Sequence, residues 1–194
     1  IDDHSRFLVG LKACPNETSI TVKSQLTAIF EQYGLPDCLL MDNGSPWGDD
    51  RESRHTIFTS WLLRLGIAVS HCRPYHPQTQ GKDERLNRTL LDEVISRHSM
   101  ASLLESQMRF DEWQQIYNYL RPHEALQLDT PASHYQPSSR LFPATLPPVT
   151  YEPDDIIRKV DEGGKIYFKK HARRVGKAFR HQVVALRSTE IDGV

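Results

Sequence analysis

The sequence predicts an α/β fold in which a mixed, largely parallel sheet is flanked by helices. Short apolar runs that fit strands alternate with longer segments whose apolar residues recur at helical spacing. One such run, residues 38–41, ends on Asp42 and is followed at once by the Asn43-Gly44 turn. After about residue 155 the helical pattern stops, and short strand-like runs rich in basic residues follow. These observations predict an α/β domain followed by a small basic β-unit.

The first third of the chain contains two predicted strands and one predicted helix. Residues 6–13 (RFLVGLKA) are apolar on both faces near their middle, as expected of a strand. Residues 18–33 carry apolar side chains at helical spacing, and Gly34 with Pro36 provides a stop. Residues 38–41 predict a short buried strand, and the polar residues 46–53 a surface insertion.

The middle of the chain continues the alternation. A helix is predicted over residues 57–65, ending at Gly66, and a short strand over residues 67–71. The polar segment 73–81, with its proline and glycine, predicts a loop, and residues 84–98 carry a regular apolar stripe typical of a helix.

The last third contains a helix, a linker and strands. A helix is predicted over residues 110–120, and the proline-rich stretch 130–153 indicates a semi-rigid linker. Three short strands are predicted at 156–160, 165–168 and 183–186, with a Gly163-Gly164 turn between the first two. The resulting organisation is a core domain over residues 1–128, a linker over 129–154 and a partial basic β-unit over 155–194.

Composition excludes several classes of protein. With 194 residues and 38% hydrophobic residues, the chain is long and apolar enough for a packed core. It has no apolar stretch of the roughly 20 residues that a bilayer requires, and no signal-peptide pattern, so no membrane partner is expected. Its three cysteines form no CxxC pair, which argues against a disulfide framework and favours a reduced, cytoplasmic environment.

The distribution of charge points to a polyanion. The net charge is −1, but residues 158–187 contain ten Lys or Arg and two acids. A local excess of this size favours DNA as the partner. The alternative is a basic surface that is simply solvated.

Two carboxylates stand out as candidates for chemistry. Asp42 follows a strand directly, and Glu84 lies at the start of a helix after a polar loop. Carboxylates that converge in this way can hold Mg²⁺, and two such ions about 4 Å apart can clamp both oxygens of a phosphodiester displacement. The alternatives are a turn residue for Asp42 and an acid that complements the helix dipole for Glu84; Asp83 fits the dipole role better.

A two-ion mechanism needs a third acid. Upstream of Asp42, Glu17 fits a helix start and Asp37 lies before its strand, at the wrong end. Asp2 and Asp3 are the remaining candidates.

Several motifs together resemble the retroviral-type integrases and the related insertion-sequence transposases, the DDE recombinases. Residues 41–45 (MDNGS) and 76–87 (HPQTQGKDERLN) are similar to the second and third acidic motifs of that family. Residues 3–7 (DHSRF) resemble the segment that opens the family's second strand. Residues 117–126 (YNYLRPHEAL) and 130–132 (TPA) resemble the stretch that follows the core.

The resemblance implies a fold and a set of site residues. The core would be ribonuclease H-like, and the basic β-unit would resemble part of a small barrel domain. By position, Asp42 and Glu84 would be catalytic and would bind Mg²⁺ or Mn²⁺. DNA-binding roles are implied for five residues: Gln80, Asn87, Arg88, Lys82 and Arg85.

The sequence departs from the family pattern in two places. The acids are separated by 41 residues, where the family usually has a number in the mid-thirties, and the insertion at 46–53 accounts for the excess. In the family the first acid lies on a strand before the segment matched by residues 3–7. The chain is therefore expected to lack the first acid and the first strand and to be truncated at both ends; the alternative is that Asp2 or Asp3 serves as a ligand.

The expected function of the parent protein is DNA transposition or integration by Mg²⁺-dependent hydrolysis and strand transfer. Its partners would be the ends of a mobile element, target DNA and further copies of itself, in the bacterial nucleoid. The resemblance also implies a helix-turn-helix upstream. This chain is expected to be inactive alone; the alternatives are a non-catalytic DNA-binding relic and a ribonuclease H-like nuclease that only hydrolyses.

Overall fold

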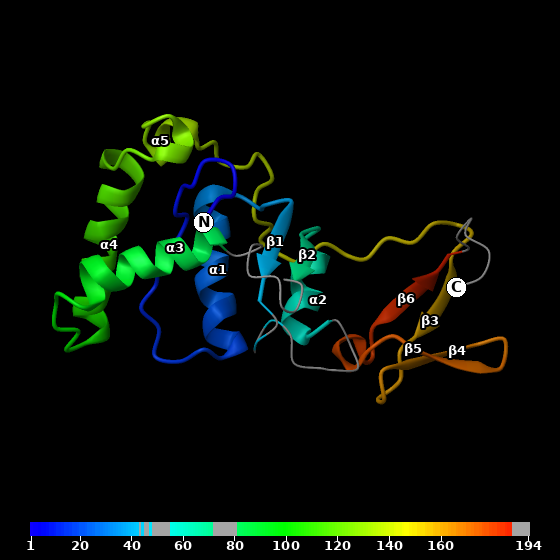
Figure 1. Cartoon of the computed structure of the whole chain (residues 1–194). Coiled ribbons are helices and arrows are strands. Elements are labelled where there is room, and N and C mark those ends of the chain that lie inside the picture. Colours follow the sequence, from blue (N-terminus) through cyan, green and yellow to red (C-terminus); the bar gives the residue numbers. More distant parts are fainter. Residues whose placement is uncertain (43, 45–46, 48–54, 72–80, 188–194) are drawn as a thin grey trace. The chain divides into compact units, whose positions relative to one another are not determined.

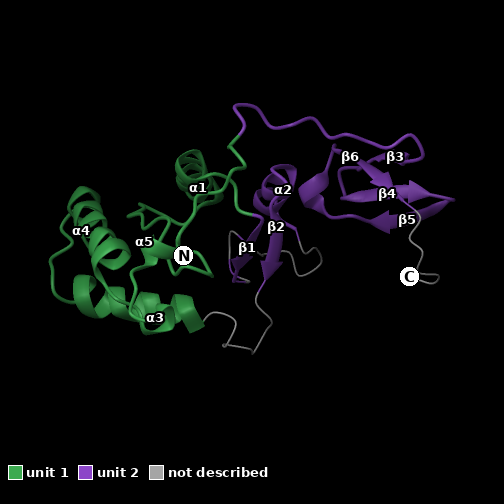
Figure 2. Ribbon diagram, turned by 90° about the horizontal axis from the view of Figure 1, so that it is seen from above, with its two compact units in different colours: residues 1–36, 72–142 green, residues 37–71, 143–194 purple. Residues whose placement is uncertain are grey.

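The computed structural model describes residues 1–42, 44, 47, 55–71 and 81–187. It is a mixed α/β structure with helices and small sheets (Figure 1), which agrees with the predicted fold class. Contacts divide the chain into two compact units (Figure 2). Unit 1 contains residues 1–36 and 72–142, and unit 2 contains residues 37–71 and 143–194. Each unit combines segments that are separate in the sequence, so the units do not test the predicted domain limits at residues 128 and 154. No described helix has the length and apolar character that a membrane span requires.

Unit 1 is built from helices. They are α1 (Ser19–Tyr33), α3 (Gly81–Leu90), the π-helical turn η2 (Leu91–Ile95), α4 (Leu103–Gln115), the π-helical turn η3 (Ile116–Leu120), the 3₁₀ turn η4 (Glu124–Leu126) and α5 (Pro131–His134). Both α3 and α4 begin earlier than the sequence predicts. The first turn of α3 is polar, and the first turn of α4 carries only the exposed Leu103 and Leu104 as apolar residues. The short helix α5 lies where a linker was predicted; Pro131 at its first position suits a helix start.

The ends of α1 follow the predicted signals. The Thr18 hydroxyl accepts a hydrogen bond from the Thr21 N–H at the start of the helix. Gly34 ends it with φ of 81°, and a Cβ there would lie 2.5 Å from the Ser138 carbonyl oxygen. The backbone is held close to Ser138 because the Ser138 N–H donates to the Tyr33 carbonyl at 2.9 Å. Glycine is therefore required at this position both by conformation and by space.

The predicted strand at residues 6–13 is wrong, because this segment forms no strand. Its backbone groups bond instead to side-chain amides of α4 and η3. Asn118 accepts from the Leu8 N–H at 2.8 Å and donates to the Leu8 carbonyl at 3.0 Å, and Gln114 donates to the same carbonyl at 2.7 Å. Gln107 accepts from the Ala13 N–H at 2.9 Å and donates to the Leu11 carbonyl at 3.0 Å. Side chains on one helix face thus take the place of a neighbouring strand.

The core of unit 1 lies between this segment and the helices that follow it. Five buried residues form it: Leu8, Leu90, Val94, Trp113 and Tyr117. A second group of rings packs around Phe7, which stacks on Tyr135 with ring centroids 4.2 Å apart. Burial raises the pKa of Tyr135 to about 12, with nearby Asp2 and Tyr33 acting in the same direction. The N-terminal segment is therefore an integral part of unit 1.

Unit 2 begins with the parallel pair that the sequence predicts. Strands β1 (Cys38–Met41) and β2 (Ala68–His71) are parallel, with Met41 paired to His71, and α2 (Ile57–Arg64) connects them. Parallel neighbours need such a crossover. A capping box between Thr56 and Thr59 fixes the start of α2. Among the described residues, β1 pairs with β2 alone.

The C-terminal part of unit 2 consists of two antiparallel strand pairs. Strand β3 (Ile156–Lys159) pairs with β6 (Val183–Leu186), and β4 (Lys165–Phe168) pairs with β5 (His171–Arg174). A 3₁₀ turn, η5 (Lys177–Phe179), lies before β6. The sequence did not predict β5, because all four of its residues are exposed and none supplies the apolar alternation of a strand.

We predict that Asn118 is essential to unit 1. Asn118→Ala should lower the free energy of unfolding by about 1–3 kcal/mol, because it leaves the buried Leu8 N–H without an acceptor. Urea denaturation measures the change.

Gln114→Ala is the matched control. It should cost less, because the Leu8 carbonyl keeps its bond from Asn118. Equal losses for the two variants would contradict the assigned role of the Leu8 N–H bond.

Candidate metal centre and nucleic-acid interface

Asp42 follows the carboxyl end of β1. Its neighbour Met41 is buried, whereas Asp42 itself is exposed. The Asp42 carboxylate accepts a hydrogen bond from the Gly44 N–H at 3.0 Å, and Nδ1 of His71 lies 3.0 Å from the Asp42 carbonyl oxygen. The turn and the neighbouring strand thus fix the backbone while the carboxylate stays open to solvent. Ligand sites in parallel sheets commonly lie at this end of the strands.

Glu84 lies in the first turns of α3, on a polar surface. Leu86 and Leu90 of this helix pack against the core of unit 1. Glu84, Asn87 and Arg88 are exposed at positions i, i+3 and i+4, so they share one face of the helix. Lys82 and Arg85 are exposed as well, and Asp83 is half-buried.

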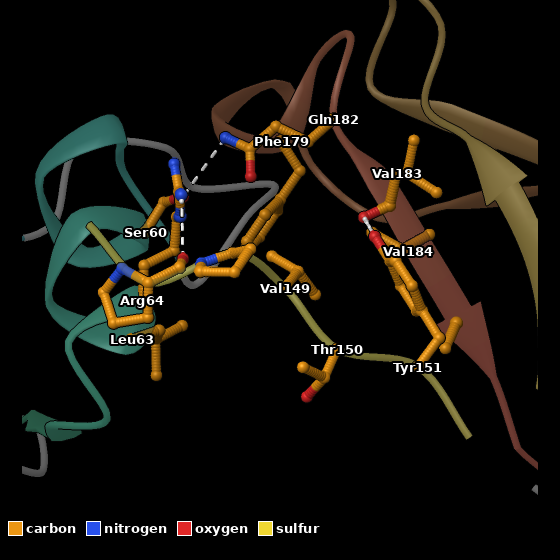
Figure 3. Close-up of a pocket in the computed structure, with 13 residues that line it drawn as sticks. Ser60, Leu63, Arg64, Val149, Thr150, Tyr151, Phe179, Gln182, Val183 and Val184 are labelled. Carbon is orange, nitrogen blue, oxygen red and sulfur yellow. Dashed lines mark hydrogen bonds between the residues drawn. The ribbon is translucent and has the colours of Figure 1, made fainter. Parts of the chain in front are cut away.

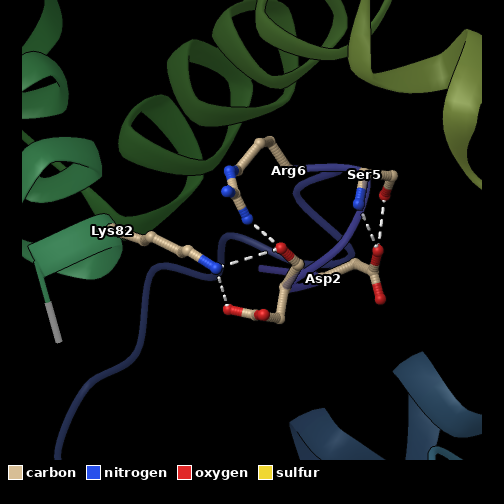
Figure 4. Close-up of polar contacts among 5 residues, drawn as sticks. Asp2, Ser5, Arg6 and Lys82 are labelled. Atoms are coloured by element: carbon tan, nitrogen blue, oxygen red, sulfur yellow. Dashed lines mark hydrogen bonds and ion pairs between the residues drawn. The ribbon is translucent and has the colours of Figure 1, made fainter. Parts of the chain in front are cut away.

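The acids at the N-terminus are engaged by neighbours (Figure 4). The Asp2 carboxylate accepts hydrogen bonds from the Ser5 N–H at 2.8 Å and the Ser5 hydroxyl at 2.6 Å. Lys82 pairs with the Asp3 carboxylate, and this hydrogen bond lowers the pKa of Asp3 against a smaller opposing effect of burial. Asp2, three residues before Ser5, is therefore the acid that closes the turn, whereas Asp3 contacts the start of α3.

A partly buried ion pair lies directly after the helix that carries Glu84. Glu93, on η2 directly after α3, accepts from Trp113 Nε1 at 2.8 Å and pairs with Arg121. The Arg121 guanidinium lies over the Trp113 and Tyr117 rings, 5.9 and 5.8 Å from their centroids. Burial acts to raise the pKa of Glu93, but the bonds from Arg121 and Trp113 together bring it below its usual value.

His123 belongs to the same cluster. Its ring meets the Tyr117 ring edge-on at 4.8 Å, and burial lowers its pKa. Arg121 and His123 therefore support the helices, and sequence reasoning missed Glu93 as the partner of Arg121. Glu93 lies on the apolar side of the helix predicted over residues 84–98, and an acid in that position indicates a buried partner.

Unit 2 also contains an open hollow of about 420 Å³ between α2, residues 147–151 and β6 (Figure 3). Hydrogen bonds across it join Arg64 to the Pro147 carbonyl at 3.2 Å and the Tyr151 hydroxyl to the Val183 carbonyl at 3.0 Å. Because its one charged side chain is already bonded to backbone, the hollow fits a structural contact better than an anion site.

The structure assigns the predicted site residues to different places. Asp42 belongs to unit 2, whereas Glu84, Asn87, Arg88, Lys82 and Arg85 belong to unit 1. Gln80 and most of the insertion at 46–53 lie outside the described residues. Within the described residues, no three His, Cys, Asp or Glu side chains gather as a metal cluster.

Comparison with known proteins identifies the family. One model of an integrase core domain matches residues 1–77, which include Asp42, and a second matches residues 65–131, which include Glu84. A model of the C-terminal domain of IS481 family transposases matches residues 155–194. The chain thus contains an integrase core domain over residues 1–131. The resemblance found in its motifs is thereby confirmed. Integrase cores work with divalent metal ions as a family.

Retroviral proteins are among the relatives. The Gag-Pol polyprotein of Walleye dermal sarcoma virus is 30% identical over 110 residues, which are 55% of this chain and 5% of that protein. The Pol polyprotein of Radiation murine leukemia virus (strain Kaplan) is 29% identical over 103 residues, 53% of this chain and 16% of that protein. The chain thus spans a small part of the length of these relatives.

A solved structure also matches. It is a chain in the CryoEM structure of the simian T-cell lymphotropic virus intasome in complex with PP2A regulatory subunit B56 gamma. The match covers 82% of this integrase-family chain and 62% of that chain, with 19% sequence identity and a TM-score of 0.48.

We predict that Arg121 stabilises unit 1 in a pH-dependent way. At neutral pH, Arg121→Gln should lower the free energy of unfolding by about 1–2 kcal/mol, because a partly buried carboxylate loses its cation. The pKa of Glu93 is lowered in the folded state, so this contribution is present above the usual glutamate pKa. It is lost as pH falls through the folded value. Urea denaturation at neutral and acidic pH measures both effects.

Arg109→Gln is the control, since the pair of Arg109 with Glu112 is exposed and should contribute little. A cost for Arg121→Gln that persists unchanged in acid would contradict the role given to the Glu93 carboxylate.

Proposed function

We propose that the integrase core in this chain serves DNA strand transfer with Mg²⁺ or Mn²⁺ in a larger parent protein, and that Asp42 and Glu84 hold the ions there. The observation that carries the proposal is the position of Asp42. It is an exposed carboxylate directly after a parallel strand, inside a matched integrase core. We also propose that the core is ribonuclease H-like and that residues 155–194 form part of a small barrel.

The donor set fits a hard divalent cation. Asp42 and Glu84 are both exposed, and carboxylate oxygens are the ligands that Mg²⁺ prefers. When bound, the ions supply charge stabilisation for the attacking and leaving oxygens of a phosphodiester. His71 and the Gly44 N–H hold the Asp42 backbone and side chain, so the carboxylate needs little reorganisation to bind.

Other residues of α3 position the DNA. Arg88 and Arg85 are exposed cations that suit phosphate, and the amide of Asn87 suits base edges or sugar. Gln80, which precedes the helix in the sequence, offers a second amide for the same role. In the proposed reaction, water first cleaves a phosphodiester at the end of the element and leaves a 3′-hydroxyl. That hydroxyl then attacks a phosphodiester of the target, and the displaced target 3′-oxygen leaves. Lys82 has a second role, because it pairs with Asp3 beside the start of α3.

The 194-residue chain is proposed not to join DNA by itself. The Asp2 carboxylate is bonded to Ser5 and the Asp3 carboxylate to Lys82, which supports neither as a free third ligand. These contacts favour a second candidate function for the chain taken alone, that of a DNA-binding remnant of the enzyme.

We predict a metal-binding signature at the two acids. Addition of Mn²⁺ should broaden the NMR signals of residues 39–42 and 81–88 by paramagnetic relaxation. Asp42→Asn and Glu84→Gln should each weaken the effect, because each removes a ligand.

Asp83→Asn is the control, since Asp83 is a neighbouring acid without a proposed ligand role. Broadening that survives Asp42→Asn and Glu84→Gln but disappears in Asp83→Asn would overturn the assignment.

The joining reaction gives an independent test. The 194-residue chain with Mg²⁺ or Mn²⁺ should bind labelled DNA in a salt-sensitive manner and produce no joined product. Joining that is abolished by Asp42→Asn would refute the proposed inactivity and would mean that Asp2 or Asp3 completes the site.

A further inference from the structure

The hairpin formed by β4 and β5, residues 165–174, concentrates positive charge. It contains five Lys or Arg and no acid. Two acids precede it. The Asp161 carboxylate accepts a hydrogen bond from the Lys165 N–H at 2.8 Å, and Glu162 pairs with Arg180 and His181 at 3.4 and 2.7 Å. Glu162 is therefore paired outside the hairpin, and Asp161 bonds to the backbone at the start of β4.

The tip of this hairpin has an unfavourable conformation for its residues. Lys169 and Lys170 form the two-residue connection between β4 and β5, and their φ angles are 48° and 67°. Turns with two positive φ angles strongly favour Asn-Gly or similar pairs, and other residues are strained there. Two adjacent lysines also repel each other. Lys169 gains a contact with the Phe168 ring, 5.3 Å from its centroid.

The exposed face carries a second unfavourable arrangement. Lys165 lies directly opposite Arg174 in the register, and like charges in that position destabilise a strand pair. On the same face, Tyr167 is 61% exposed and lies opposite Ala172, whose small side chain leaves the ring uncovered. The other face contains Ile166, which is 2% exposed and anchors the hairpin in unit 2.

We propose that the exposed face of the β4–β5 hairpin binds an unpaired nucleic-acid strand. Lys165, Lys169, Lys170 and Arg174 contact phosphates, and a base stacks on Tyr167. The cost of the strained turn and of the like-charge pair is offset when a polyanion binds. An aromatic ring between cations is the arrangement that binds single strands, because every base offers a face for stacking. This inference rests on the proposed function in that it takes DNA as the partner.

The test is a binding titration with the full 194-residue chain in EDTA, so that the metal site does not contribute. The probes are a labelled 12-nucleotide oligo-dT, a 12-base-pair duplex and inorganic polyphosphate, which has charge but no bases. Tyr167→Ala should weaken oligo-dT binding by roughly 5- to 150-fold and leave the affinities for the duplex and for polyphosphate nearly unchanged. Tyr167→Phe keeps the ring and should bind like the wild type.

The double substitution Lys169→Asn with Lys170→Gly separates binding from folding. It should weaken the binding of all three probes. It should also reduce the slope of log affinity against log salt concentration for oligo-dT by about 0.7 per lysine. It should also raise Tm by roughly 2–4 °C, because it relieves the strained turn. A variant that unfolds more easily would contradict the strain argument.

The outcomes distinguish this inference from the proposed function. If the hairpin variants bind oligo-dT as the wild type does, the inference fails while the metal-binding prediction for Asp42 and Glu84 is untouched. If Tyr167→Ala weakens the binding of polyphosphate as much as the binding of oligo-dT, base stacking on Tyr167 is refuted. If the wild type binds no DNA at all, the inference and the proposed function both fail.

Discussion

The need of each backbone N–H and carbonyl for a partner shapes both units. In unit 1, residues 8–13 have no neighbouring strand, and three side-chain amides of one helix face bond to their backbone instead. In unit 2 the same need is met by the parallel ladder between β1 and β2. The first solution fixes the helices that support Glu84, and the second fixes the strand end that presents Asp42. The proposed chemistry therefore depends on how two short segments satisfy their main-chain groups.

Elements with a strong local pattern could be predicted from the sequence. The parallel strands, the helix between them and the capped helix α1 appear where apolar spacing and caps indicate them. The segment 6–13 has equally apolar residues, but whether it becomes a strand depends on a neighbour, which local pattern does not reveal. Strand β5 was missed for the opposite reason, since it is exposed throughout and exists because it pairs with β4.

The sequence indicated the two acids of the candidate site, but not the contacts that hold the surrounding structure. Asp42 and Glu84 follow from their place after a strand and after a loop, together with the family resemblance. The contacts that hold the helix of Glu84 come from distant parts of the chain. Asp3 pairs with Lys82, and Arg121, which lies over two aromatic rings, pairs with Glu93. Pairings of this kind need a fold before they can be recognised, because charged residues at such separations have many alternative partners.

The two units are interleaved along the chain, and this has a consequence for synthesis. Unit 1 combines residues 1–36 with 72–142, and unit 2 combines residues 37–71 with 143–194. During synthesis, the Leu8 N–H can form its hydrogen bond only after Asn118, 110 residues later in the chain, has left the ribosome. Residues 37–71 of unit 2 are synthesised even longer before residues 143–194, which belong to the same unit. Contacts so distant in sequence slow folding, so the nascent chain is expected to depend on chaperones until the strands of residues 156–186 have been synthesised.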